Sequence, residues 1–188
     1  MTNLQKLIDM DIPTLIKQTR TKEANPGGGA ILILISNLAI NLVLMMDKND
    51  WGEYKELADV SHETILKSSD KLSILMQDDV DNFDNLMKAY KDGSINDQHY
   101  IDASRPLLDM IEINLDAMDV LGFYLGYGKK STITDGQIAN DLLRSTSLAG
   151  LPTIKINLGQ FKEEEVIKER IEKLYHCLLY TSPSPRDV

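Results

Sequence analysis

One aspartate occupies a position where an apolar side chain is expected. Six residues recur at steps of four, three, four, three and four: Leu72, Met76, Asp79, Phe83, Leu86 and Tyr90. This is the spacing of a helix stripe that faces a core. Because a lone ionised carboxylate is costly to bury, Asp79 would have to be paired, hydrogen-bonded or placed beside a wet pocket. A rotation of the helix by one position would instead bury Leu75 and Val80 and leave Asp79 at the rim.

Three consecutive glycines precede the most apolar segment of the chain. Pro26-Gly27-Gly28-Gly29 leads directly into Ala30 to Met46. Glycines cost backbone entropy, but they leave exposed N–H groups at the positive end of a helix, which suits a carboxylate or a phosphate. The glycines are equally consistent with a tight turn where two helices pack closely.

A second candidate aspartate lies in the segment Thr134-Asp135-Gly136-Gln137. Asp135 stands three and seven residues before Ile138 and Leu142, so it lies at the top of their stripe. An ordinary helix N-cap at Thr134 or Asp135 explains the same residues.

Other catalytic and metal-binding motifs are missing from the sequence. His62-Glu63 lacks a second histidine at the zinc-binding spacing, and His62 is expected to be a structural or rim residue. The sequence also lacks a phosphate loop with lysine, a dinucleotide fingerprint and a nucleophile triad, and we expect no metal site.

The surrounding pattern predicts an all-α fold, an up-and-down helical bundle with one long helix. The segment from Glu53 to Tyr90 contains no proline or glycine, and at about 1.5 Å per residue it would span more than about 50 Å. Asp92-Gly93-Ser94 is expected to end it. The other expected elements are a helix start or break at Pro13, a loop over 19–25, a helix over 30–46, a turn over 47–52, a helix that contains Pro106, a loop over 122–128, a helix over 134–149, an aliphatic run over 154–158 and an amphipathic helix over 162–176.

Composition limits the possible partners and location. The 188 residues suit one domain, and 43% hydrophobic with 26% charged residues is ordinary for a folded protein. A net charge of −9 argues against nucleic acid as the main partner. With one cysteine and no pattern of a secretory leader, we expect a cytoplasmic protein. Because Ala30 to Met46 contains Ser36, Asn37 and Asn41 and is shorter than about 20 residues, we expect a buried helix there rather than a membrane span.

The last twelve residues do not fit the rest of the chain. Cys177 to Asp187 resembles the translation of a common transposase-based sequencing adapter, and a genuine Pro/Ser-rich terminus is the alternative. We therefore expect a helical domain over residues 1–176 and an adapter-encoded, non-native segment over 177–188.

Taken in order, several segments resemble the cyclodeaminase/cyclohydrolase family, which comprises the C-terminal domain of formiminotransferase-cyclodeaminase and stand-alone methenyltetrahydrofolate cyclohydrolase relatives. The matching segments are Pro26 to Gly29 before Ala30 to Met46, Asp78-Asp79 with Phe83, Met87-Lys88-Ala89-Tyr90, Pro106-Leu107, Thr134-Asp135, Gln137-Ile138-Ala139, Gly150 and Ile156-Asn157-Leu158. The sequence departs from the family pattern at Ile31 to Leu34, Asp92 to Ser94, Thr134 and Thr153.

The resemblance implies a folate one-carbon enzyme of the formimidoyltetrahydrofolate cyclodeaminase or methenyltetrahydrofolate cyclohydrolase type. It implies a homodimer with no metal, no cofactor beyond the tetrahydrofolate substrate, and no nucleic-acid or membrane partner. Asp79 and Asp135 are the implied catalytic residues. The implied substrate-binding residues are Pro26, Gly27, Gly28, Gly29, Thr134 and Asn157, with the glycine N–H groups holding the anionic glutamate end of folate. A non-catalytic folate-binding or dimerisation bundle derived from the family is the alternative.

Overall fold

A computed structural model of the protein describes residues 6–21 and 26–158. The helices are α1 (Ile12–Gln18), α2 (Gly28–Val43), α3 (Lys55–Asp92), α4 (Asp97–Tyr127) and α5 (Ile133–Leu158), with 3-10 turns at Leu7–Asp9, Leu44–Met46, Gly52–Tyr54 and Lys130–Thr132. The described residues form no strand, which confirms the predicted all-α class. The amphipathic helix expected over 162–176 and the segment 177–188 lie outside the described residues.

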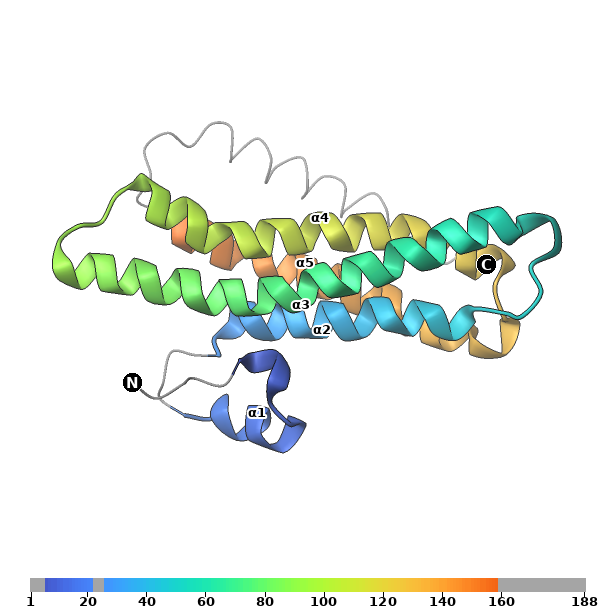
Figure 1. The fold of residues 1–188 in the computed structure, drawn as a ribbon, viewed down its shortest axis with the longest axis horizontal. Helices are drawn as coiled ribbons and strands as arrows, with labels where there is room; N and C mark the ends of the chain where they lie inside the picture. The colour runs from blue at the N-terminus through green and yellow to red at the C-terminus, as the bar shows by residue number, and fades with distance from the viewer. Residues whose placement is uncertain (1–5, 22–25, 159–188) are drawn as a thin grey trace.

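Helices α2 to α5 alternate in direction and form the predicted up-and-down bundle (Figure 1). Each helix packs against the next one along the chain, and α5 closes the bundle by packing against α2. The α3–α4 hairpin extends beyond the start of α2, and α1 lies beside that same end of α2 (Figure 1). The start of α2 therefore lies against the middle of α3, where the predicted stripe is found.

The N-terminal segment is attached to the bundle through α3. Pro13 lies in the first turn of α1, and the Thr14 N–H donates to Asp11 Oδ1 at 2.7 Å, so the helix start predicted at Pro13 is confirmed. Leu7 is buried, and its N–H donates to Oε1 of Gln77 at 3.1 Å.

Helix α2 is long and apolar enough to cross a membrane by length and composition, but half of the segment Gly28–Met46 is buried in the bundle. Its polar residues are bound by neighbouring helices. Ser36 Oγ donates to Thr146 Oγ1 of α5 at 2.8 Å, and Asn37 Nδ2 donates to Ser73 Oγ of α3 at 2.9 Å. The polar positions of the apolar run are therefore contacts between helices.

The observed orientation of α3 lies between the two orientations that the sequence allowed, the predicted stripe and the alternative rotated by one position. Leu72, Met76 and Leu86 are buried as the stripe predicts, and Val80 is buried as the rotated alternative predicts. Asp79 and Phe83 are partly buried between these rows. The stripe is wrong at its end, because Tyr90 is 64% exposed and Ala89 is buried in its place. The helix ends at Gly93, whose φ of 68° lies in the left-handed region that favours glycine, as predicted.

The loop predicted over 122–128 is wrong, because α4 continues to Tyr127. Phe123 and Tyr127 are four residues apart and therefore share one side of the helix. Phe123 stacks on Trp51 with ring centroids 5.2 Å apart, and Tyr127 lies 4.4 Å from the ring of Tyr54. These aromatic contacts with a distant segment outweigh the low helix propensity of the two glycines, Gly122 and Gly126.

The break predicted between residues 149 and 154 is also wrong, because α5 runs through Pro152 to Leu158. Leu151 and Ile154 are buried, while Pro152 is exposed on the outer side of the helix. Gly150 lies against Met110 and Ile111 of α4. Burial on both sides of the proline keeps the segment helical although its backbone loses one hydrogen bond.

Candidate functional site

Asp79 of α3 lies directly against the start of α2. A Cβ atom at Gly29 would lie 2.5 Å from Oδ1, 2.6 Å from Oδ2 and 2.8 Å from Cγ of Asp79. The backbone N–H of Ala30 donates a hydrogen bond to the same carboxylate. The helix stripe predicted an inward-facing acid, the resemblance assigned that acid and the glycines to one site, and the structure places them in contact.

The surroundings of Asp79 change its acidity. Burial raises the pKa of Asp79 from 3.8 to about 6, and the hydrogen bond from the Ala30 N–H opposes this rise. A carboxyl group with a pKa near 6 is present in both its charged and its neutral form close to neutral pH. Such a group can both accept and donate a proton.

Asp79 opens into a small pocket at this end of the bundle. The pocket has a volume of about 170 Å³ and receives residues from all four long helices: Gly27, Gly28, Gly29, Asp79, Phe83, Ala103, Thr153 and Asn157. One wall is the backbone of the glycine turn, another is the ring of Phe83, and the carboxylate is the one ionisable group on the lining. The arrangement suits a ligand with a planar, polar or cationic group that meets the acid.

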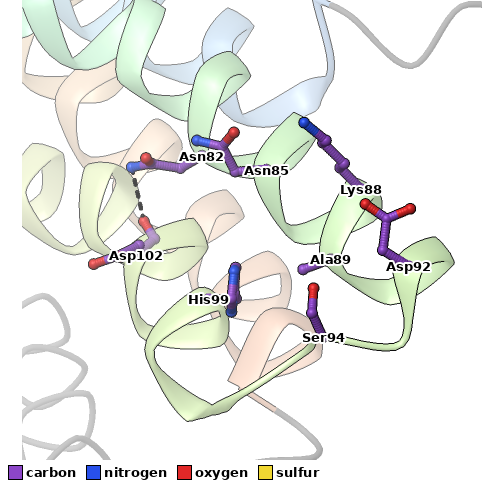
Figure 2. A pocket seen from close by; sticks show the side chains of 8 residues that line it. All are labelled: Asn82, Asn85, Lys88, Ala89, Asp92, Ser94, His99 and Asp102. Atoms are coloured by element: carbon purple, nitrogen blue, oxygen red, sulfur yellow. Dashed lines mark hydrogen bonds between the residues drawn. The ribbon is translucent and has the colours of Figure 1, made fainter.

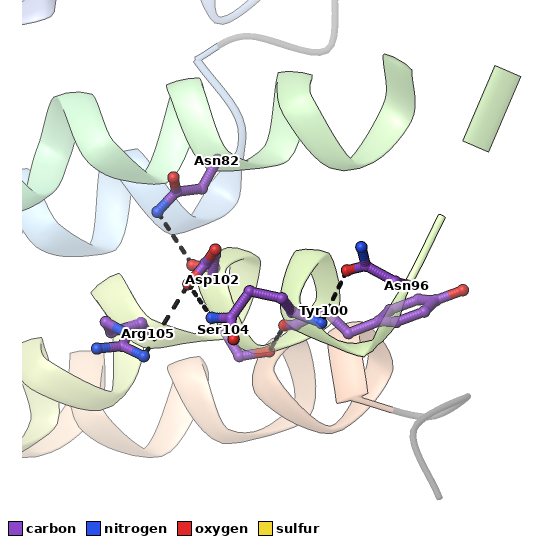
Figure 3. Close-up of polar contacts among 7 residues, drawn as sticks. Asn82, Asn96, Tyr100, Asp102, Ser104 and Arg105 are labelled. Carbon is purple, nitrogen blue, oxygen red and sulfur yellow. Dashed lines mark hydrogen bonds and ion pairs between the residues drawn. The ribbon is translucent and has the colours of Figure 1, made fainter. Parts of the chain in front are cut away.

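A proline in α4 leaves a backbone carbonyl free to bind α3, and this bond holds the two helices together beside the pocket. Pro106 has no N–H, so the carbonyl of Asp102 lacks its partner four residues on. Asn82 of α3 supplies the missing donor, since its Nδ2 donates to the Asp102 carbonyl oxygen at 3.0 Å (Figure 3). The next carbonyl, that of Ala103, accepts a hydrogen bond from Asn157 Nδ2 at 3.0 Å. These two bonds hold α3 and α5 against α4 beside Phe83 and Asn157.

The structure brings together five of the eight residues that the sequence and the resemblance suggested for the site. Gly27, Gly28, Gly29, Asp79 and Asn157 line the pocket. Pro26 is buried just before the turn but does not line the pocket.

Thr134 and Asp135 do not line this pocket, although the resemblance implied that Asp135 is catalytic and that Thr134 binds substrate. A Cβ atom at the neighbouring Gly136 would collide with Sδ of Met46, at the far end of α2. Met46 follows Gly29 by roughly 25 Å of helix. Neither residue caps the helix either, because α5 already begins at Ile133.

Sequence reasoning missed three residues of the lining, which are Phe83, Ala103 and Thr153. Phe83 belonged to the predicted stripe but was assigned to the core, and Thr153 was noted as a departure from the family pattern. Ala103 carries no signal in the sequence, because only the packing of α4 against α5 brings it to the pocket.

Two other pockets contain no residue predicted for the site. A polar pocket of about 340 Å³ lies between the end of α3 and the start of α4, and Figure 2 shows Asn85, Lys88 and His99 around it. A second pocket lies at the opposite end, beside His62 and Asp47, where His62 Nδ1 is 2.6 Å from Asp47 Oδ2. His62 thus pairs with the turn before α3, as expected of a structural residue. The described residues contain no cluster of three or more side chains suited to a metal ion.

Comparisons with known proteins identify the family and the fold. A sequence model of the formiminotransferase-cyclodeaminase family matches residues 11–176. A comparison with curated protein sequences finds no match. Among solved structures, the chain is similar to the crystal structure of formiminotetrahydrofolate cyclodeaminase from Thermotoga maritima, with a TM-score of 0.83 and 22% identity over 91% of each chain. That likeness shows a shared fold, and the family match covers most of the sequence. The chain therefore belongs to the formiminotransferase-cyclodeaminase family.

Proposed function

We propose that this protein is a folate one-carbon enzyme that acts on formimino- or methenyl-tetrahydrofolate. Two reactions are considered, an ammonia-eliminating cyclisation and a hydrolytic ring opening to formyl-tetrahydrofolate. The family membership and the name of the similar structure support the substrate class. The observation that carries the proposal is a proton-exchanging carboxyl group, Asp79, in a pocket lined by the glycine turn, Phe83 and Asn157.

In the cyclisation, a folate nitrogen attacks the formimino carbon, and the bond from that carbon to the departing nitrogen breaks. The formimino group reacts in its protonated, amidinium form, so its nitrogen already carries two protons. The attacking nitrogen loses one proton, the departing nitrogen gains it and leaves as ammonia, and the positive charge stays on the methenyl product. Asp79 can relay this proton, because its pKa of about 6 allows it to accept and to release one near neutral pH.

In the hydrolysis, water adds to the methenyl carbon and the bond from that carbon to one of the two folate nitrogens breaks. The Asp79 carboxylate can take one proton from the attacking water and pass it to the departing nitrogen. The second proton of the water is released to solvent, which removes the positive charge of the methenyl ring. Both reactions pass through a cationic carbon. A partly dry carboxylate stabilises such a cation, and the ring of Phe83 adds an attractive aromatic face.

The glycine turn retains part of the binding role that the sequence suggested for it. The Ala30 N–H already donates to Asp79. Gly28 and Gly29 occupy the first two positions of α2, so their N–H groups have no carbonyl partner within the helix. We assign these two N–H groups to polar or anionic oxygen atoms of the substrate.

The test is a turnover assay that follows the absorbance of methenyl-tetrahydrofolate, with each of the two substrates in turn. Asp79→Asn is expected to lower kcat by at least about a hundredfold, because it removes the proton relay, while the protein stays folded and its folate affinity stays nearly unchanged. Unchanged turnover in this variant would remove Asp79 from the mechanism. A wild-type protein that is thermally stabilised by folate but turns over neither substrate would instead be the non-catalytic folate-binding bundle.

A further inference from the structure

We propose that Gly29 is a positioning residue, which holds the Asp79 carboxylate at the start of α2 because it has no side chain. Its effect on turnover rests on the proposed function, whereas the contact itself does not. The sequence suggested that the glycines serve the substrate through their backbone N–H groups, and the geometry points to a second role for Gly29, which depends on its missing side chain.

The requirement for glycine at position 29 is steric. Gly29 lies inside the first turn of α2 and does not have a positive φ, so its backbone conformation is open to any residue. Space is the limit, because the three atoms nearest to an added Cβ are Oδ1, Oδ2 and Cγ of Asp79, all within 2.8 Å. Contacts this short force the carboxylate or the helix to move. The adjacent Gly28 differs, since nothing lies within 4 Å of a Cβ atom there.

Asp79 also takes the place of a missing capping side chain. The N-cap residue of α2 is Gly27, which has no side chain to accept a hydrogen bond, and the first turn contains no acidic residue. Helix starts are stabilised by an oxygen acceptor at this position and by a negative charge near it. The Asp79 carboxylate provides both from the neighbouring helix through the Ala30 N–H.

Two neighbouring residues at the start of α2 therefore act on the carboxyl group. The absent Cβ allows it to approach the helix start, and the N–H of Ala30 fixes it there. A side chain at position 29 removes both conditions together. The carboxylate would then rotate away or α2 would separate from α3, and in either case the acid would leave its place in the pocket.

The first experiment measures melting temperature in four proteins: wild type, Gly29→Ala, Asp79→Ala and the double variant. Gly29→Ala is expected to lower the melting temperature when Asp79 is present. It is expected to raise it in the Asp79→Ala background, because the obstructing atoms are gone and alanine favours a helix over glycine. The same sign in both backgrounds would overturn the proposal.

A matched control comes from the neighbouring glycine. Gly28→Ala is expected to change the melting temperature in the same direction with and without Asp79, because its Cβ meets no atom. If Gly29→Ala alone does not fold, the double variant is expected to recover folding. A double variant that also fails to fold contradicts the proposed contact.

The second experiment measures kcat for Gly29→Ala in two backgrounds, one with Asp79 and one with Asp79→Asn. Gly29→Ala is expected to lower kcat at least tenfold with Asp79 present and to have no further effect in the Asp79→Asn background, because it acts through the acid. Full kcat in Gly29→Ala, or an equal loss in both backgrounds, would exclude a positioning role. A wild-type protein without turnover would refute the proposed function. The melting temperatures of the four proteins would still show whether Gly29 and Asp79 are in contact.

Discussion

At the scale of single residues, the protonation of Asp79 links the site to stability. Its carboxyl group is partly buried, and burial raises its pKa from 3.8 to about 6 even though the Ala30 N–H lowers it. The folded protein therefore binds a proton more tightly at this position than the unfolded chain does. A site of this kind weakens the fold when the acid is charged.

This difference predicts a pH dependence of the free energy of unfolding. Between pH 4 and pH 6 the folded state holds more protons, so the contribution of Asp79 to stability is most favourable below pH 4 and is lost as the pH rises through 6. The loss is at most about 3 kcal/mol, from about two pKa units. Asp79→Asn should remove this contribution and be more stable than wild type at pH 8.

Urea denaturation of both proteins at a series of pH values checks this prediction. The informative quantity is the difference between the two proteins, because other carboxylates titrate equally in both. If the difference in free energy of unfolding between the two proteins stays constant from pH 4 to pH 8, burial does not raise the pKa of Asp79.

At the scale of helices, Pro106 and Asn82 form a matched pair on two elements. The proline deletes the hydrogen bond to the Asp102 carbonyl, and the amide of Asn82 replaces it at 3.0 Å. A carbonyl left without a partner at a helix interface costs about 1–3 kcal/mol. The pair therefore fixes how α3 packs against α4 beside the pocket.

Asn82→Ala is accordingly expected to lower the free energy of unfolding by about 1–2 kcal/mol. The loss should be smaller in the Pro106→Ala background, because the new N–H at position 106 can donate to Asp102. Asn85→Ala, an exposed position on the same helix, serves as the control and should change stability by less than about 0.5 kcal/mol. An equal loss of unfolding free energy for Asn82→Ala in both backgrounds would show that Asn82 does not replace the hydrogen bond that Pro106 removes. Chemical denaturation gives all of these values.

At the scale of the whole molecule, α2 is central to the packing, yet part of its surface stays uncovered. Its neighbours are α3, α4 and α5, and one buried amide, Asn114 of α4, donates to both Ser36 of α2 and Ser147 of α5. No charged residue occurs between Gly28 and Met46, but Leu38 is 61% exposed and Met45 52% exposed. Leu38 and Met45 are seven residues apart, about two helical turns, so both lie on the same outer side of α2 and the 3-10 turn that continues it.

We propose that a second copy of the chain covers this side of α2, in line with the homodimer that the family resemblance implies. Light scattering is expected to give the mass of two chains for the wild type and of one chain for Leu38→Glu, because a buried charge at the interface is costly. Lys71→Glu, at an exposed position on α3 that already carries a charge, is the control and should keep the wild-type mass. A monomeric wild type, or a dimeric Leu38→Glu, would place the interface elsewhere or exclude it.

The fold class was predictable because it depends on local patterns. Apolar spacing, the uninterrupted run from 53 to 90 and the stop at Gly93 define helices that short connections force into an antiparallel bundle. The aromatic face of α4 and the helix through Pro152 were not predictable, because distant contacts decided them against local propensity.

The site divides in the same way. The sequence by itself determined that an acid stands in the apolar stripe and that glycines open α2, since residue type and spacing show both. Only the tertiary structure decided that Gly29 faces Asp79, that Thr153 and Ala103 complete the pocket and that Asp135 lies at the other end. The physical reason is that a helix stripe specifies which side chains face inward, whereas the register between helices decides which of them meet.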